Sequence, residues 1–515
     1  MADSIQSTAS NAAAGSQSEL VKGLGLLDST MIVVGSMIGS GIFIVSADIA
    51  NQVRSPALLL IVWAAAGAMT LIGALSYGEL AAAMPKAGGQ YVYLRESLGP
   101  LWGFLYGWTM LLVIQTATIA AVAISFAKFA GVLIPWFSAS SWILKFGTMG
   151  PWTFWFGTLG PYNVGLNTQN LLSILSIILI TWLNTRGLRV GAIVQNVFTL
   201  TKTGTLALLA LIGIAFSTAA ARNANFVHFW RNASLSTLHP YPPDTHTWMV
   251  GTLTLVAVAL VGALFASDAW NNITFTAGEV KNPSRNLPLS LALGTAIVIT
   301  LYLLANFAYL RVLPLEGDPN GATVISRGIQ YAAEGRVGTA TAEVVLGSAG
   351  AAIVAIAIMI SAFGCNNGLI LAGARIYYAM AKDGLFFKSV GTVNHFRAPA
   401  MALVVQCIWA SILCLSGTYS QLLDFLIFAV LIFYILTLTG LFVLRRTRPD
   451  MARPYRAIGY PFLPAIYIVV ALFIEIQLLR YKPQYTWPGL IIVLLGVPVY
   501  LAWKLAARRP SGESA

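Results

Sequence analysis

Charged residues are scarce in this chain. Asp, Glu, Lys and Arg make up only 9% of its 515 residues, whereas 57% are hydrophobic. Soluble domains are about one quarter charged, so this composition excludes a soluble globular protein and indicates one that crosses a membrane many times. The net charge is +12. Because the basic residues lie in short loops between apolar segments, they report membrane topology and do not indicate nucleic-acid binding.

Residues that build metal or catalytic sites are equally few. There are three cysteines and four histidines, and we find no nucleophile elbow, zinc-protease motif or phosphate-binding loop. The cysteines lie in apolar segments, where we expect packing roles; they are Cys365, Cys407 and Cys414. The histidines lie in loops; they are His228, His239, His246 and His395. We therefore expect no metal site, no cofactor and no enzymatic activity. Residues 1–22 lack an apolar core, so we expect a disordered tail over residues 1–24 and no cleavable leader.

Apolar segments long enough to span a bilayer recur about twelve times along the chain. They lie near residues 29–50, 56–84, 100–134, 166–185, 189–217, 248–276, 287–312, 342–381, 400–417, 421–444, 460–479 and 486–507. When the loops are assigned alternately to the two sides, most basic residues fall on the side of the N-terminus. The sequence thus predicts an all-α polytopic protein of the inner or plasma membrane, with both termini cytoplasmic. Short loops and the lack of a disulfide pattern favour a prokaryotic origin.

The first apolar segment contains a stretch that is poorly suited to a continuous helix. Residues 35–43 hold three glycines and two serines in the run Gly-Ser-Met-Ile-Gly-Ser-Gly-Ile-Phe. Unpaired backbone is tolerated inside a bilayer only where it lines a cavity within the protein. We therefore predict that the helix opens here, so that freed N–H groups around Gly39-Ser40-Gly41 face an anion and freed carbonyls face a cation. An amino acid zwitterion carries both charges. The alternative is that these small residues only let two helices pack closely.

A second interruption is predicted in the sixth segment, at residues 264–272. This stretch reads Leu-Phe-Ala-Ser-Asp-Ala-Trp-Asn-Asn, and Asp268 at the bilayer centre costs at least about 2.5 kcal/mol unless it faces a cavity or a partner. The second interruption comes five segments after the first, and an odd number of helices per repeat inverts the second copy. Paired broken helices at matching positions indicate a transporter binding site.

Lys202 lies deep in the fifth segment, about 13 residues beyond Arg189, or about 20 Å along a helix. Snorkelling to the inner surface would be a long reach, so we predict a functional role. A fixed ammonium beside the opened first helix would donate to the carbonyls near Gly35 and Ser36 and replace a sodium ion. Proton coupling through Lys202 stays an alternative.

In the turn after the second interruption, we expect Glu279 to pair with Lys281 or with an arginine on another inner loop, as a gate or a structural clamp.

Several of these stretches resemble the amino acid–polyamine–organocation superfamily, and in particular its L-type amino acid transporter branch. The resemblance rests on motifs that occur in order over residues 29–445: 39–43 (Gly-Ser-Gly-Ile-Phe), 77–80 and 85–91, 265–270 (Phe-Ala-Ser-Asp-Ala-Trp), 279–288, and 366–384. It implies a LeuT-like core of two inverted five-helix repeats, with helices 1 and 6 broken and two further helices. We therefore expect repeats at residues 25–218 and 248–445, accessory helices at 458–508 and a cytoplasmic tail at 509–515.

The resemblance also implies a substrate site. The amides of Gly39, Ser40 and Gly41 would bind the substrate carboxylate, and carbonyls near Met37 and Phe265 would face its amino group. Phe265 would cover the site as an outer gate, and Asn367 would form part of the pocket wall. The remaining residues of the predicted site are Ser36, Ile38, Ala266, Ser267 and Asp268.

This sequence departs from the family pattern at three points. Ser267 replaces the usual Tyr and Ala269 the usual Gly, so the side-chain pocket need not match known members. Gly278 replaces the first of two glutamates, which predicts a weaker inner clamp. The loop at residues 135–165 has no cysteine, so no disulfide-linked helper subunit is expected. Asp268 has two interpretations, as an acceptor for amides of its own broken helix, which we prefer, or as a partner for a cationic side chain.

The function predicted from the sequence is sodium-independent exchange of small or medium neutral amino acids by alternating access. The main alternative is a proton-coupled symporter, either for amino acids in general or for cationic amino acids or amines. A channel is less consistent with two broken helices around one midpoint. An amino acid sensor without transport is the alternative from outside the transporter class.

Overall fold

The computed structural model describes residues 22–155, 157–159, 162–230, 248–416 and 419–508. Residues 1–21 of the predicted tail at 1–24, the predicted tail at 509–515 and residues 231–247 lie outside these ranges. Within them, ten helices are long and apolar enough to cross a membrane, and two shorter apolar helices, Gly251–Ala266 and Ala400–Leu415, occupy the sixth and ninth predicted positions. The prediction of an all-α polytopic membrane protein with about twelve spans is confirmed.

The first half of the chain supplies the helices of the first five predicted spans. The first span is divided in two, and the third contains one turn of π-helix between two α-helical parts. The elements are α2 (Leu26–Met37), α3 (Gly41–Val53), α4 (Pro56–Ala83), α5 (Gln90–Leu98), α6 (Pro100–Thr109), η1 (Met110–Ile114), α7 (Gln115–Leu133), α8 (Thr168–Thr185), α9 (Leu188–Ala215) and α10 (Ala219–Phe226).

The second half repeats the pattern of a divided helix followed by long spans. Its elements are α11 (Trp248–Ala266), α12 (Asn272–Phe275), η3 (Ala277–Glu279), α13 (Pro283–Val312), α14 (Val324–Arg327), η4 (Ala333–Gly335), α15 (Val337–Lys382), η5 (Lys388–Gly391), α16 (Ala400–Ser416) and α17 (Tyr419–Thr447). Two further helices, α18 (Phe462–Tyr481) and α19 (Pro483–Arg508), complete the chain. The divided helices α2/α3 and α11/α12 confirm that helices 1 and 6 are broken.

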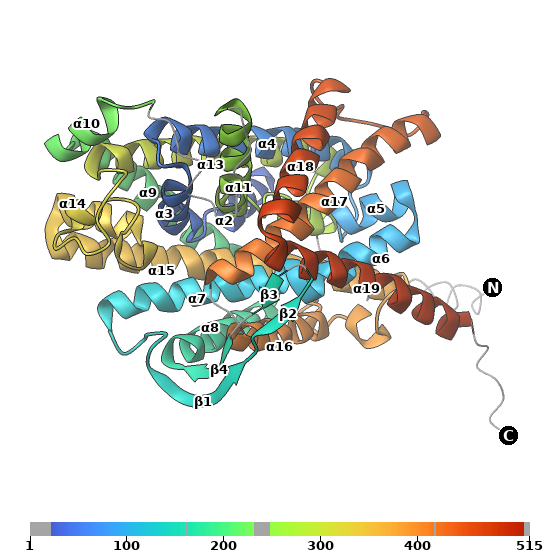
Figure 1. Cartoon of the computed structure of the whole chain (residues 1–515). Helices are drawn as coiled ribbons and strands as arrows, with labels where there is room; N and C mark the ends of the chain where they lie inside the picture. The colour runs from blue at the N-terminus through green and yellow to red at the C-terminus, as the bar shows by residue number, and fades with distance from the viewer. Residues whose placement is uncertain (1–21, 156, 160–161, 231–247, 417–418, 509–515) are drawn as a thin grey trace, which may run out of the picture.

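The long helices form a scaffold around the two broken helices. α15 and α7 lie side by side (Figure 1), and α15 also packs against α9. On the other side, α13 packs against α4, α9 and α2, and α11 packs against α3. Both broken helices are therefore enclosed by other helices, which gives their interrupted backbone the protein-lined surroundings that it needs in a bilayer.

The loop between the third and fourth spans is folded as antiparallel β-structure, which the sequence analysis did not predict. It contains β1 (Trp142–Met149), β2 (Trp152–Phe154), β3 (Gly157–Leu159) and β4 (Tyr162–Asn167). β1 pairs with β4 and β2 pairs with β3, and together they form the long arm in Figure 1. The ring of Trp155 lies 4.4 Å from that of Trp487 on α19, so this loop connects the rim of the scaffold with the last helix.

Candidate functional site

The first helix opens where its small residues predicted it. α2 ends at Met37, Ile38 leaves the helical conformation with ψ 89°, and α3 begins at Gly41. Two glycines are required by close neighbours. A Cβ on Gly39 would lie 3.2 Å from the Cys365 sulfur, and a Cβ on Gly41 would lie 2.8 Å from the Cβ of Ala266. Gly41 thus brings the two broken helices into direct contact.

The carbonyls freed at this break are bound by side chains from surrounding helices. Lys202 Nζ on α9 donates to the Gly35 carbonyl, as predicted from its depth in the fifth segment. Lys202 is buried, with 1% of its surface exposed. The other donors are Cys365 Sγ to Ser36 O (3.0 Å), Tyr302 OH to Met37 O (3.0 Å), and Ser361 Oγ to Ile38 O and Gly39 O (both 3.2 Å). The sequence analysis missed Tyr302 and Ser361, because a single hydroxyl in an apolar segment gives no distinctive signal.

The N-terminus of α3 carries the backbone amides of the break that suit an anion, and Ser40 and Gly41 are both buried there. Gly39 N donates to Met37 O at 2.8 Å, so in this conformation its amide is not available to a substrate. Ser40 and Gly41 stand at the start of α3, where backbone amides have no partner within the helix. The Ser40 hydroxyl makes no capping hydrogen bond and, like that of Ser36, has no partner in the described part of the chain. An anion is stabilised at such a helix end.

The sixth helix is interrupted over residues 267–271. α11 ends at Ala266. Ala269, three residues later, adopts a left-handed conformation with φ 64°, which is unfavourable for a residue with a Cβ and keeps the chain out of the helical conformation before α12. Tyr302 OH lies 3.0 Å from both Met37 O and Ala266 O. One hydroxyl therefore ties the two breaks together, next to the place where Gly41 contacts Ala266. Phe265 is 7% exposed beside this contact.

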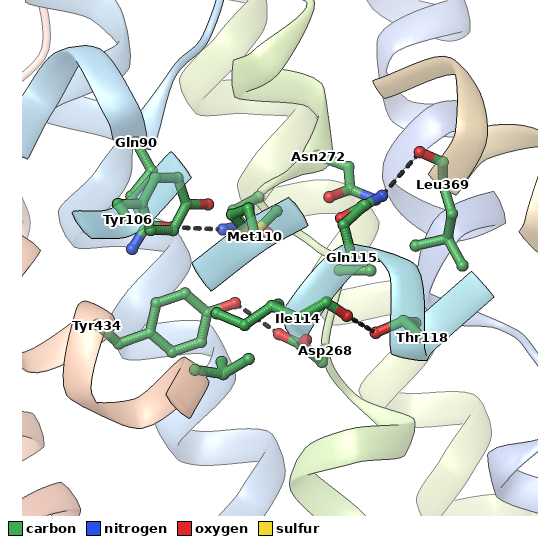
Figure 2. Close-up of a pocket in the computed structure, with 13 residues that line it drawn as sticks. Gln90, Tyr106, Met110, Ile114, Gln115, Thr118, Asp268, Asn272, Leu369 and Tyr434 are labelled. Atoms are coloured by element: carbon green, nitrogen blue, oxygen red, sulfur yellow. Dashed lines mark hydrogen bonds between the residues drawn. The ribbon is translucent and has the colours of Figure 1, made fainter. Parts of the chain in front are cut away.

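Asp268, which lies within the second break, lines two cavities. Tyr434 OH on α17 donates to Asp268 Oδ1 at 2.5 Å, as Figure 2 shows. The first cavity is lined by Gln90, Tyr106, Met110, Ile114, Gln115, Thr118, Asp268, Ala269, Asn271, Asn272, Leu369, Val430 and Tyr434. Ser267 and Asp268 line the second, with Trp270 and Tyr467. The sequence analysis did not predict this wall of the cavity. Gln115, a strongly polar residue in an apolar stretch of the third span, was the feature of the sequence that could have indicated it.

Asn367 is placed differently from the other predicted site residues. Its Oδ1 accepts a hydrogen bond from Asn184 Nδ2 on α8 at 2.9 Å, and it is not among the residues that line the two cavities. Met37, Ile38, Gly39, Gly41 and the other residues of the first break do not line these cavities either. The structure therefore brings the two breaks together and leaves Asn367 facing the scaffold.

The partner predicted for Glu279 was wrong. Glu279 pairs neither with Lys281 nor with an inner-loop arginine but with Arg375, inside the long helix α15, at 3.1 Å. Both side chains are at most 2% exposed. Backbone hydrogen bonds from Gly23 N and Leu24 N to Glu279 O and from Lys281 N to Leu24 O fasten the same turn to the start of α2. The turn after the second break is thus held from two sides.

A second charged cluster joins the ends of several helices. Arg445 and Arg453 lie 2.6 Å and 3.3 Å from the buried carboxylate of Glu79 on α4. Glu96 on α5 pairs with Arg95 and Arg448. Partial burial raises the pKa of Glu96, but its two arginine partners outweigh that effect and hold the pKa below its ordinary value. These pairs fix the loop after α17 to α4 and α5. No cluster of three metal-ligating side chains occurs in the described ranges.

Comparison with known proteins agrees with this architecture. The family model described as amino acid permease matches residues 24–499. The chain is 30% identical over 504 residues to the b(0,+)-type amino acid transporter 1 of Mus musculus, covering 95% of this chain and 91% of that protein. It is 31% identical over 484 residues to the large neutral amino acids transporter small subunit 2 of Homo sapiens, covering 93% of this chain and 80% of that protein.

Proposed function

Because the chain belongs to the amino acid permease family, we propose that it is a sodium-independent transporter that exchanges small or medium neutral L-amino acids by alternating access. The observation that carries the proposal is the meeting of the two broken helices at Gly41 and Ala266. One break offers the amide end of α3 and the other offers carbonyls, so the two ends of a zwitterion find opposite partial charges. Ser36, Met37, Ile38, Gly39, Ser40, Gly41, Phe265, Ala266 and Ser267 are the residues proposed to surround it.

The proposed independence from sodium is supported by Lys202. Its ammonium binds the Gly35 carbonyl, which is one of the backbone groups freed near the first break. A covalently fixed cation at this point leaves no need for a bound metal ion to neutralise those carbonyl dipoles. We propose that Lys202 couples α2 to the scaffold helix α9 as the broken helix moves.

The experiment is counterflow in liposomes containing the purified full-length chain. Vesicles loaded with unlabelled amino acid should accumulate external labelled alanine or leucine, equally with sodium or with choline as the external cation. Empty vesicles should accumulate little label. A requirement for sodium would contradict the Lys202 argument, and binding of labelled substrate without any counterflow would indicate a sensor.

A proton-coupled symporter is the second candidate, and it is supported by the position of Asp268. Asp268 is an intramembrane carboxyl beside two cavities, and such groups commonly serve in proton or cation binding. An inwardly directed pH gradient that drives uptake into vesicles without internal substrate would support this candidate.

We also propose that both termini are cytoplasmic in an inner or plasma membrane and that no disulfide-linked subunit is needed. Migration at the monomer's mass on a non-reducing gel of native membranes is expected.

A further inference from the structure

The cavity beside Asp268 has an unusual polar lining for the middle of a membrane protein. One carboxylate and four carboxamides face it, from Asp268, Gln90, Gln115, Asn271 and Asn272, and none of its lining residues is basic. Figure 2 shows Gln90 from α5, Gln115 from α7, and Asp268 and Asn272 from the second break around this cavity. Burying a polar group here costs free energy unless the group is hydrogen-bonded within the protein or to a polar ligand. The groups that lack a partner within the protein therefore indicate which ligand the cavity binds.

Most of these polar groups already have partners. Asn271 Nδ2 donates to Gln90 Oε1 at 2.8 Å, and Gln115 Nε2 donates to Leu369 O at 2.7 Å. Asn272 is the exception. It is 2% exposed, and its amide nitrogen has no hydrogen-bond partner in the described part of the chain. The cavity thus combines a carboxylate that accepts hydrogen bonds with a donor that lacks an acceptor.

We propose that this cavity receives the side chain of the transported amino acid and selects a carboxamide, as in asparagine or glutamine. The inference rests on the proposed function and deepens it. A carboxamide carries both an oxygen acceptor and an NH₂ donor. Its oxygen accepts from Asn272, and its NH₂ group donates toward Asp268.

Side chains of different chemistry match this lining less well. A carboxylate side chain would place a second negative charge beside Asp268. A cationic side chain has no acceptor for the Asn272 amide. An apolar side chain leaves the Asn272 amide without an acceptor and gives the Asp268 carboxylate no donor beyond Tyr434.

The cavity lies within reach of a substrate held at the breaks. Gly41 contacts Ala266, and Asp268 follows Ala266 by two residues. Consecutive Cα atoms are about 3.8 Å apart, so the Cα atoms of Ala266 and Asp268 are separated by at most about 7.6 Å. An amino acid whose charged groups bind at the breaks therefore extends its side chain toward Asp268 when the side chain points along the interrupted segment.

The test compares three amino acids with the same heavy-atom skeleton: asparagine, aspartate and leucine. Liposomes containing the full-length chain are loaded with labelled asparagine or, in a parallel set, with labelled leucine. Efflux is measured against each external amino acid and against arginine. The half-maximal concentration should be at least about tenfold lower for asparagine than for leucine or aspartate, because a site built to pair polar groups rejects analogues that lack them. Equal values for the three, or a lower value for leucine, aspartate or arginine, would overturn the inference. Leucine exchange without asparagine exchange would overturn it while leaving the proposed function intact, whereas no exchange of any amino acid would count against the proposed function itself.

Variants then assign the selectivity to the cavity. Asn272→Leu should raise the half-maximal concentration of asparagine about tenfold and leave that of leucine unchanged. Asn320→Leu, on an exposed loop, is the matched control and should change neither value. Unaltered asparagine selectivity in Asn272→Leu would overturn the assignment. If Asn272→Leu does not fold, Asn272→Ala provides the same comparison, and the panel on the unsubstituted chain decides the substrate class by itself.

Discussion

At the scale of single residues, Gly41 carries the contact between the two broken helices. A methyl group at this position would lie 2.8 Å from the Cβ and 3.0 Å from the Cα of Ala266. Because the second of these is a backbone atom, it cannot move aside without shifting α11. We predict that Gly41→Ala destabilises the chain by roughly 1–3 kcal/mol, the usual cost of overpacking, and lowers exchange by at least about tenfold.

Gly204→Ala is the control for that substitution. Gly204 lies in α9, and a Cβ there would meet no atom within 4 Å, so alanine should leave both the melting temperature and the exchange rate unchanged or slightly improved. The comparison is made by thermal unfolding in detergent and by initial exchange rates in liposomes. Equal behaviour of the two variants would show that the contact at Gly41 is looser than the structure indicates.

Lys202 supports a second prediction at this scale. Lys202→Ala removes the donor to the Gly35 carbonyl and, with it, a positive charge fixed deep in α9. A hydrogen bond to a charged group contributes about 1.5–3 kcal/mol, so we expect the maximal exchange rate to fall by about ten- to a hundredfold, with a smaller change in the half-maximal substrate concentration. Lys128→Ala, toward the end of α7, should keep the wild-type rate, as expected for a snorkelling lysine. Wild-type turnover in Lys202→Ala would remove its proposed coupling role.

At the same scale, the sequence predicted the residues with a strong local signal. Glycine and serine marked the first break, Asp268 and its asparagines marked the second, and Lys202 stood out as the one charge deep in its segment. The partners of these residues were not predictable. Tyr302, Ser361 and Tyr434 are hydroxyl-bearing residues in otherwise apolar helices, and only the packing of distant segments shows that they face freed carbonyls or Asp268.

At the scale of elements, the buried pair Glu279–Arg375 links the turn after the second break to α15. Removing one partner of a buried ion pair leaves an uncompensated charge and typically costs roughly 3–5 kcal/mol, whereas replacing both by apolar residues is often neutral. We predict that Glu279→Met and Arg375→Met each lower the melting temperature strongly and that the double variant recovers most of the loss.

The exchange rate of the double variant distinguishes a gate from a clamp. If the pair closes the inner side during each cycle, the double variant should be stable yet exchange slowly, with faster leak of label from the vesicles. A stable double variant with normal exchange and no leak would assign the pair a purely structural role. A loss of stability in the double variant equal to the sum of the losses in the two single variants would contradict a direct interaction between the side chains.

The elements themselves were predicted unevenly. Apolar length located the spans, because about 20 apolar residues are needed to cross a bilayer. The β-structured arm between the third and fourth spans was not predicted, since its strands are short, lack a clear alternation of polar and apolar residues and depend on pairing across the loop. The π-helical turn Met110–Ile114 was also missed, because it reflects the local packing of the third span and has no sequence motif.

At the scale of the whole molecule, the distribution of basic residues predicts which face is cytoplasmic. One long apolar element, α15, separates the exposed Asn320 from the exposed Ser389, and it is kinked at Gly347, where φ is 72°. The basic loops on the Ser389 side should remain inside the cell. In intact cells, a membrane-impermeant maleimide should therefore label Asn320→Cys and not Ser389→Cys.

Inside-out vesicles should reverse this labelling pattern. The unsubstituted chain gives the background, since its cysteines lie on α15 and α16 and two of the three are buried. Labelling of both variants from one side would mean that α15 does not cross the bilayer. The segment of residues 248–445 would then contain an even number of spans and could not repeat the five spans of the first half. The orientation of the second break relative to the first is set by the five spans that precede it, so the contact between Gly41 and Ala266 would stand. What this result would remove is the division of the chain into two equivalent five-helix repeats.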